Sequence, residues 1–311
     1  MNSRSRRAQR LEQVARLYYE DNKTQEAIAS IMEISRPLVS RMLNEARKLG
    51  IVEIKIHSSD QSGSLLVNQL KRHFDIKDGI ILPDTGSNHI VNRSLANATM
   101  QLIEKMGGGR IGIGWGHIIG TLVDVIEESA PDKNFISDIS PLVGNFSVTI
   151  RNYHSNENVR IIAHQTKATP HYLYSPAFAE TQQELELLLQ TEHYRTVYRE
   201  WERLDAAIVN IGNYPSTPDF ATVARYGDLL TKHKAVGRLV AHYFSEDGTI
   251  IHSDSDYAIQ IPIPLLEKCN KTIGVCSANL GSKALIGALK TGLFTHIIAG
   301  ESLVRDVLNK I

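Results

Sequence analysis

The sequence has few cysteines and no long apolar run. Its two cysteines, Cys269 and Cys276, exclude a disulfide framework and a CxxC zinc site, and they fit a reducing compartment. No stretch approaches the roughly 18 uninterrupted apolar residues of a membrane span. The basic N-terminus MNSRSRRAQR is not followed by the apolar run of a signal peptide. We therefore expect a cytoplasmic protein without a membrane segment.

The chain also lacks a net charge, but its charges are unevenly distributed. Residues 1–50 carry ten Lys and Arg against six Asp and Glu, whereas the other 261 residues carry 24 against 28. A length of 311 residues suggests about two domains. The distribution favours a small basic domain that binds a polyanion, attached to a larger and mildly acidic one.

Two helices and a later strand are expected in the first 56 residues. The segment RLEQVARLYYEDN has apolar residues at helical spacing. Thr24 suits the N-cap of a second helix, QEAIASIM, in which Ala27, Ile28 and Ile31 share one face. Residues 51–56, IVEIKI, alternate between apolar and polar side chains, which predicts the strand of a wing.

A third helix is expected between them, in ISRPLVSRMLNEARKLG, residues 34–50. Ser35 suits its N-cap, Pro37 is tolerated in the first turn, and Gly50 suits the position after the last turn. The stripe expected to be buried consists of Val39, Met42, Leu43, Ala46 and Leu49. The opposite side carries Arg36, Pro37, Ser40, Arg41, Asn44 and Lys48.

The second and third helices together are typical of a helix-turn-helix. Its second helix fits the major groove of DNA, where arginine can bind guanine with two hydrogen bonds and hydroxyl groups can contact phosphates. The expected DNA-binding residues are Thr24, Gln25, Ser35, Arg36, Pro37, Ser40, Arg41 and Asn44. An amphipathic helix with solvated charges is the alternative. The capped helix, the tight turn and the repeated Ser-Arg pairs favour DNA binding by residues 1–56.

Residues 57–64, HSSDQSGS, are polar and rich in Gly and Ser, which predicts a linker between the two domains. The second domain then covers residues 65–311. Its first segment places Leu66, Leu70 and Phe74 at four-residue spacing on a helix. That apolar edge belongs either to the core or to a dimer contact, and we favour the core.

The second domain alternates strand-like runs with helical segments. The runs are GIILP, RIGIG, DISPLVG, HYLYSP, AAIVNIG, TIGVC and THIIAG. The helical segments include SLANATMQLIEKM, IIGTLVDVIEES, NVRIIAHQT and SKALIGALKTG. This alternation predicts an α/β domain with a Rossmann-like, doubly wound parallel sheet covered by helices. Such sheets bind ligands at the carboxyl ends of their strands.

Glycines occur where these strands are expected to end. Gly112, Gly114 and Gly116 follow one strand, and Gly212 and Gly281 mark two similar turns. Backbone amides in such turns can bind a phosphate at a helix N-terminus, although glycines also serve tight packing. The full GxGxxG fingerprint with a downstream acid is missing, so a dinucleotide is not expected. Lys283 falls in the first turn of a helix, where it either faces an anion or faces solvent.

The whole chain resembles the SorC family of bacterial sugar-responsive transcriptional regulators, also called the deoxyribonucleoside-regulator-like group. The resemblance is carried, in order, by RLYYEDNKTQEAIASIMEISRPLVSRMLNEARKLGIVEI, RIGIGWG, AAIVNIG, AVGRLVAHYFSEDG and GSKALIGALKTG. It implies an effector domain similar to glucosamine-6-phosphate deaminase and ribose-5-phosphate isomerase. It also implies operator DNA, a phosphorylated sugar or polyol as effector, and a homodimer or homotetramer. Neither a metal nor a cofactor is expected.

The effector-binding residues expected from the glycine turns and this resemblance are Gly112, Gly114, Trp115, Gly116, His117, Asn156, Gly212, Gly281 and Lys283. Some positions depart from the family pattern. His117 and Ile118 replace residues that usually include a hydroxyl, and Arg238 replaces an acid in AVGR. Val143 stands where some members carry a lysine that bonds covalently to a sugar aldehyde. That covalent chemistry is therefore not expected.

A sugar-phosphate isomerase or deaminase is the alternative, because one fold can carry several functions. Such an enzyme needs a carboxylate or histidine base beside the sugar. The candidates are His117, Glu157, His164, Asp254 and Asp256. They form no paired acid and base in the sequence, and an enzyme has no use for residues 1–56. A DNA-binding protein without an effector would not need the second domain. We therefore expect an effector-controlled regulator of a carbohydrate operon.

Overall fold

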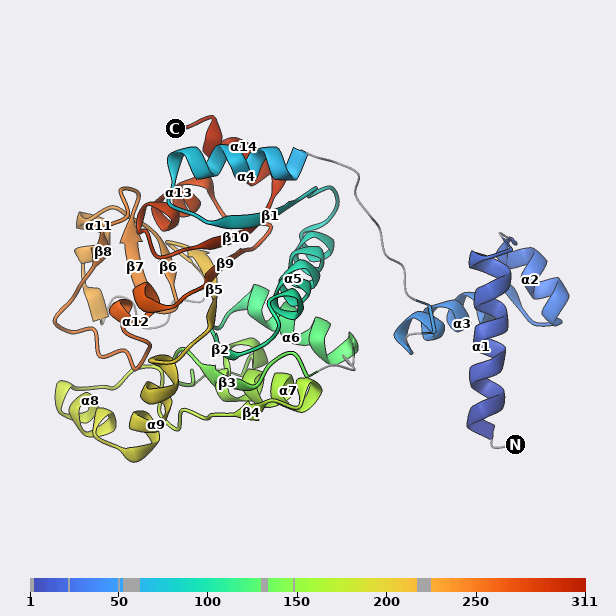
Figure 1. Cartoon of the computed structure of the whole chain (residues 1–311), viewed down its shortest axis with the longest axis horizontal. Helices are drawn as coiled ribbons and strands as arrows, with labels where there is room; N and C mark the ends of the chain where they lie inside the picture. Colours follow the sequence, from blue (N-terminus) through green and yellow to red (C-terminus); the bar gives the residue numbers. More distant parts are fainter. Residues whose placement is uncertain are drawn as a thin grey trace. The chain divides into compact units, whose positions relative to one another are not determined.

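The computed structural model describes residues 3–21, 23–49, 51–52, 62–129, 134–147, 149–216 and 225–311. The chain divides into two compact units, Met1–Ser59 and Asp60–Ile311 (Figure 1). Each unit has its own hydrophobic core, and each is described by itself.

The N-terminal unit contains three helices, α1 (Ser3–Tyr19), α2 (Gln25–Met32) and α3 (Arg36–Lys48). Apolar residues at helical spacing on each helix meet in one core. Its buried members are Leu11, Val14, Ala15, Ile28, Val39, Met42, Leu43 and Ala46. The predicted helices and most of the predicted stripe on α3 are therefore present.

A short turn of residues 33–35 connects α2 to α3. The hydroxyl of Thr24 caps α2 by accepting a hydrogen bond from the amide of Ala27 at 3.2 Å. Glu33 ends α2 in the left-handed region with φ of 54°. The next helix begins at Arg36, directly after Ser35, and the amide of Leu38 donates to the carbonyl of Ser35 at 2.9 Å.

One apolar residue expected to be buried is exposed. Leu49, predicted in the buried stripe of the third helix, is 61% exposed. It directly follows the last residue of α3, and helical spacing alone does not show where the covering helices stop. Ile31, expected on one face with Ala27 and Ile28, is 54% exposed, whereas Ile28 is buried. Gly50 and residues 53–56 lie outside the described residues, so the helix end at Gly50 and the wing strand stay predictions. Helix α4 (Ser62–His73) includes residues 62–64 of the expected linker.

The second unit is built on one sheet with a parallel part and an antiparallel extension. The parallel order is β1-β10-β9-β5-β2-β3-β4. These strands are β1 (Asp78–Leu82), β2 (Arg110–Ile113), β3 (Asp138–Pro141), β4 (Thr169–Pro170), β5 (Ala206–Asn213), β9 (Thr272–Cys276) and β10 (His296–Gly300). The extension consists of β6 (Ala235–Leu239), β7 (His242–Ser245) and β8 (Ile250–Ile251), and its first strand pairs with the end of β5.

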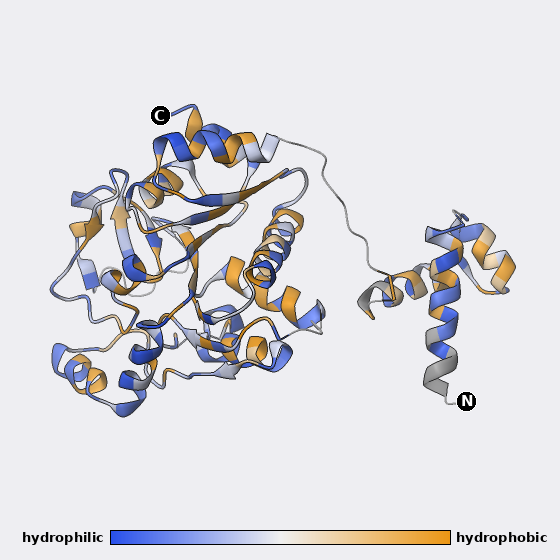
Figure 2. Cartoon of the chain, viewed as in Figure 1, coloured by the Kyte–Doolittle hydropathy of each residue, from blue (hydrophilic) through white to orange (hydrophobic). Residues whose placement is uncertain are grey.

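Helices cover both faces of this sheet. Residues of α5 (Asn88–Lys105), α6 (His117–Ser129) and α7 (Ser155–Thr166) form one core. Residues of α4, α9 (Glu192–Trp201), α12 (Ile263–Lys268), α13 (Ser282–Lys290) and α14 (Glu301–Leu308) form the other. Strand residues alternate between them, so Ile208 joins the first core and Val209 the second. Polar and apolar residues alternate along these amphipathic helices (Figure 2).

Most expected elements of this unit are found, including the parallel α/β arrangement. Leu66, Leu70 and Phe74 are buried in the core, as favoured. The predicted strand HYLYSP is wrong, since pairing with β3 is limited to Thr169 and Pro170. Remaining described helices are α8 (Gln182–Leu189), α11 (Leu229–Lys232) and the 3₁₀ turn Arg151–Tyr153.

Candidate functional site

The first candidate surface is the exposed side of α3. Arg36, Pro37, Arg41 and Asn44 are exposed, and Ser40 is partly buried. The Nε atom of Arg36 lies 2.7 Å from a carboxylate oxygen of Glu26. Both side chains are mostly exposed, so this ion pair is weak and can open for another anion.

The predicted hydroxyl groups lie at the amino ends of α2 and α3. Thr24 precedes α2, Gln25 begins it, and Ser35 precedes α3. Thr24 and Ser35 are exposed, and Gln25 is partly buried. Amino ends of helices carry unsatisfied amide groups and partial positive charge, which suits contacts to phosphate. The eight predicted DNA-binding residues thus belong to the two consecutive helices and their caps.

The second candidate site lies at the carboxyl ends of β2, β5 and β9. Strand β5 lies between the other two (Figure 1). The helix that follows β2, α6, covers one face of the sheet, whereas α13, which follows β9, covers the opposite face. This arrangement is a topological switch point, where open α/β sheets bind their ligands. The three predicted glycine turns are therefore neighbours in the fold.

The turn after β2 requires glycine at one position in particular. Gly116 has φ of +106°, and a Cβ atom there would lie 2.9 Å from the Nδ2 atom of Asn210 on β5. Its amide donates to the carbonyl of Asn152 at 3.1 Å, and the amide of Gly114 donates to Ile208 at 2.9 Å. His117 follows as the exposed first residue of α6.

Gly112 has a different environment from the other two glycines of this turn. It lies within β2, and a Cβ atom there would be 2.4 Å from a side-chain carbon of Leu142. This contact matches the packing explanation for a glycine. The backbone of β2 can approach the core at this position because no side chain intervenes.

A buried arginine joins the turn after β2 to the end of β5. Arg238 on β6 is paired with Gly212 on β5, and its guanidinium lies 4.4 Å from the ring of Trp115. Both Arg238 and Trp115 are buried. Burial lowers the pKa of Arg238, because desolvation disfavours its charged form. The residue that departs from the family pattern is therefore placed beside two predicted site residues.

The turn before α13 is fixed by the last residue of β5. Asn213 accepts a hydrogen bond from the amide of Gly281 at 2.9 Å and donates one to the carbonyl of Asn279 at 3.0 Å. Two residues later, Lys283 is exposed, and its Nζ atom lies 3.7 Å from a carboxylate oxygen of Glu246.

Lys283 borders an open cleft of about 830 Å³. The cleft is formed by Tyr214, residues 233–236, the β7–β8 region and Lys283. Its polar lining includes His233, Lys234 and His252 as well as the acidic residues Glu246 and Asp247. The two alternatives for Lys283 are thus compatible, because the side chain is exposed to solvent within a concave surface.

The side chain of Asn156 forms its hydrogen bonds with a segment other than the glycine turns. Its Oδ1 atom accepts from the amide of Leu173 at 3.0 Å, and its Nδ2 atom donates to the carbonyl of Leu173 at 3.2 Å. The side chain therefore fixes the segment after β4.

The sequence did not single out Asn210, Asn213 or the placement of Arg238. The available signal was the change within β5 from the apolar AAIV to the more polar NIGN.

Two of the carboxylates considered for an enzyme bind arginine side chains. Asp256 accepts hydrogen bonds from Arg225 at 2.8 Å and from the hydroxyl of Tyr226 at 2.6 Å. Glu157 binds Arg160 at 2.7 Å, and this contact lowers the pKa of the carboxyl group. A carboxylate held by arginine is a poor general base.

Comparisons with known proteins agree with this arrangement. Residues 61–309 match the family model described as "Putative sugar-binding domain". The chain belongs to this family. It is 28% identical to the sorbitol operon regulator of Klebsiella pneumoniae over 290 residues, covering 89% of this chain and 90% of that protein. It is 24% identical to the deoxyribonucleoside regulator of Bacillus subtilis over 312 residues, covering 96% and 97%.

The crystal structure of the full-length sorbitol operon regulator SorC from K. pneumoniae superposes with a TM-score of 0.76 at 24% sequence identity, covering 96% of this chain and 98% of that one. The predicted membership of the SorC family is confirmed, and so is the prediction of a transcriptional regulator at the level of the family. These relatives are regulators and not enzymes. Among the described residues, every helix is too short or too polar to cross a membrane.

Proposed function

We propose that this protein binds operator DNA through its N-terminal unit and that a phosphorylated sugar or polyol controls that binding. The observation that carries the proposal is the pairing of two features in one chain. One is the exposed basic side of α3, the helix that follows the capped helix α2 in the chain. The other is the set of neighbouring turns after β2, β5 and β9.

The DNA-binding part of the proposal is a winged helix-turn-helix. Arg36 and Arg41 would read base edges in the major groove, and the caps at Thr24 and Ser35 would contact phosphates. Two copies of the chain, as a dimer or within a tetramer, would place two such helices in successive grooves about 34 Å apart. The regulated operon would be one for carbohydrate use, as in the sorbitol operon regulator.

The effector part rests on charge and position at the switch point. Lys283 supplies a cation in the first turn of α13, beside an open cleft, where it would neutralise a phosphate. Asn210 and the turn at Gly116 would contact the rest of the ligand. Arg238 adds a buried positive charge next to this turn. The proposed likeness to sugar-phosphate deaminases and isomerases agrees with such a site.

Control follows if the effector binds one arrangement of the subunits more tightly than another. The ligand then changes DNA affinity by that difference, typically about 1–3 kcal/mol. No residue needs to transfer a proton or form a covalent bond for this purpose.

The test is a titration of labelled DNA from upstream of the protein's own gene, followed by fluorescence anisotropy at fixed salt. We expect that one sugar phosphate or polyol phosphate from a broad panel changes the Kd for DNA by about 5- to 150-fold. The unphosphorylated parent compound should have little effect. An equal response to both compounds would contradict a role for the phosphate group. If no compound of the panel changes the Kd for DNA, effector control is contradicted.

A further inference from the structure

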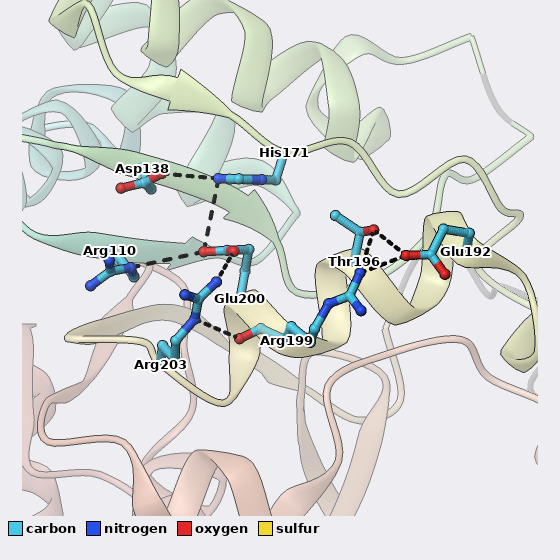
Figure 3. A network of polar contacts seen from close by, with 8 residues as sticks. All are labelled: Arg110, Asp138, His171, Glu192, Thr196, Arg199, Glu200 and Arg203. Carbon is cyan, nitrogen blue, oxygen red and sulfur yellow. Dashed lines mark hydrogen bonds and ion pairs between the residues drawn. The ribbon is translucent and has the colours of Figure 1, made fainter.

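A second cluster of polar side chains lies at the opposite edge of the sheet. Arg110 begins β2 and Asp138 begins β3, so both lie where these parallel strands start. His171 follows β4, and Glu200 is in the last turn of α9. Figure 3 shows the side chains of Asp138, His171 and Glu200 converging on one point. The proposed DNA and effector sites use none of these residues.

The distances between the three side chains are close to those of ligands on one metal ion. The Nε2 atom of His171 lies 3.0 Å from an oxygen of Asp138 and 3.8 Å from an oxygen of Glu200. All three ligand atoms lie within 4.8 Å of one another. A zinc ion with bonds of about 2.0–2.1 Å in tetrahedral geometry holds its ligand atoms about 3.4 Å apart. Small side-chain rotations would therefore make room for the ion.

Outer contacts hold the two carboxylates in place. Arg203 binds Oε1 of Glu200, which leaves Oε2 as the oxygen that faces His171 (Figure 3). The side chain of Ser137 hydrogen-bonds the carboxylate of Asp138. Metal-binding carboxylates are commonly held by such outer hydrogen bonds.

Two hydrogen bonds to β3 hold the segments behind the cluster. Trp201, next to Glu200, is buried, and its Nε1 atom donates to the carbonyl of Pro141 on β3 at 2.8 Å. The amide of His171 donates to the carbonyl of Ile139 on the same strand at 2.8 Å. The segment that carries His171 and the helix end that carries Glu200 are thus both hydrogen-bonded to β3, the strand that carries Asp138.

The competing explanation is an ion-pair network without a metal. Arg110 contributes to that network, but its Nε atom is 3.9 Å from Oε2 of Glu200 and its side chain is 42% exposed. This long contact can give way to an ion, because the arginine can turn into solvent. Two carboxylates would balance the charge of a divalent ion, with His171 as a neutral ligand.

We propose that Asp138, His171 and Glu200 form a binding site for Zn²⁺, with a fourth position open to water. A set of one nitrogen and two carboxylate oxygens suits zinc and related transition metals. The ion would join β3, the segment after β4 and α9. Its effect would be to stabilise the effector unit from the edge opposite the glycine turns.

The test uses the untagged full-length chain, freed of metal by a chelator and then dialysed. Isothermal titration with zinc chloride should show one ion per chain at this site, and the Tm should rise with zinc concentration because the ion binds the folded state. His171→Ala should lower zinc affinity more than about 100-fold, since it removes a direct ligand. Glu200→Gln keeps the side-chain volume and should also weaken binding.

His164→Ala is the matched control, since His164 is an exposed histidine on α7 outside the cluster. It should titrate like the unchanged protein. Circular dichroism should show that His171→Ala and Glu200→Gln remain folded. If the unchanged chain binds no zinc, or if both cluster variants bind it equally well, the cluster is an ion-pair network and the proposal is wrong.

Discussion

The two units of this protein present their candidate sites in different ways. In the N-terminal unit, two helices consecutive in the chain and their caps form the surface, and Arg36, Arg41 and Asn44 all lie on the exposed side of α3. In the second unit, residues far apart in the chain meet, such as Trp115 with Arg238 and Gly281 with Asn213. The first candidate site is therefore set mainly by which residues occupy neighbouring positions in the sequence. The second is set mainly by the order of strands in the sheet, which brings distant residues together.

The largest expected effect is that of a substitution that destabilises the N-terminal unit and leaves the second unit folded. Ile28 is fully buried in the small core, and Ile28→Ala should destabilise the N-terminal unit by about 2–5 kcal/mol. DNA binding should be lost, while the thermal transition of the second unit persists. Calorimetry would measure both. Ile31→Ala, at an exposed residue of the same helix, should change stability by no more than about 0.5 kcal/mol.

The next effect tests whether α3 reads DNA. Arg41 makes no hydrogen bond or ion pair with other described residues, and Arg41→Ala should weaken specific operator binding by about 1–3 kcal/mol. Anisotropy titrations would measure this loss, and effector affinity should not change. Arg16→Ala removes an exposed arginine of α1 and serves as the control. Equal binding by Arg41→Ala and the unchanged chain would place the DNA contact elsewhere.

The smallest of these effects concerns the effector site. Lys283→Ala should retain operator binding and lower the affinity for a phosphorylated effector about tenfold, or about 1.4 kcal/mol, since it removes one charged contact to a phosphate. Titration with the compound found in the DNA assay would measure it. Lys290→Ala changes an exposed lysine at the other end of α13 and should have no effect. If Lys283→Ala leaves the effector affinity unchanged, this lysine is not part of the effector site.

Much of the fold could be predicted because it follows from local patterns. The N-cap at Thr24, the start of α3 after Ser35 and the buried Leu66 and Leu70 all reflect spacing within one helix. The burial of Leu49 was mispredicted because burial at a helix end depends on the length of its neighbours. The β6–β8 extension was missed, since its short strands lack a run of alternating residues.

The candidate effector site was predictable only in outline. Glycines at strand ends predicted turns at one edge of the sheet, and β2, β5 and β9 are neighbours there because parallel strands end together. The sequence could not show that Arg238 pairs with Gly212 or that Asn210 approaches Gly116. Those contacts depend on the order of strands, and β2, β5 and β9 are neighbours in the sheet although long stretches of chain separate them.

Strand β5 changes its neighbour along its length. Its first half pairs with β2, and its last three residues, 211–213, pair with β6 instead. The antiparallel extension therefore joins the parallel strands through its pairing with β5, and α13 also packs against it. It carries Arg238 and much of the wall of the cleft. Under the proposed function, substitutions confined to this extension would change which small molecule is recognised without replacing any residue of the parallel strands. A regulator built in this way would change its ligand preference while its framework stays intact.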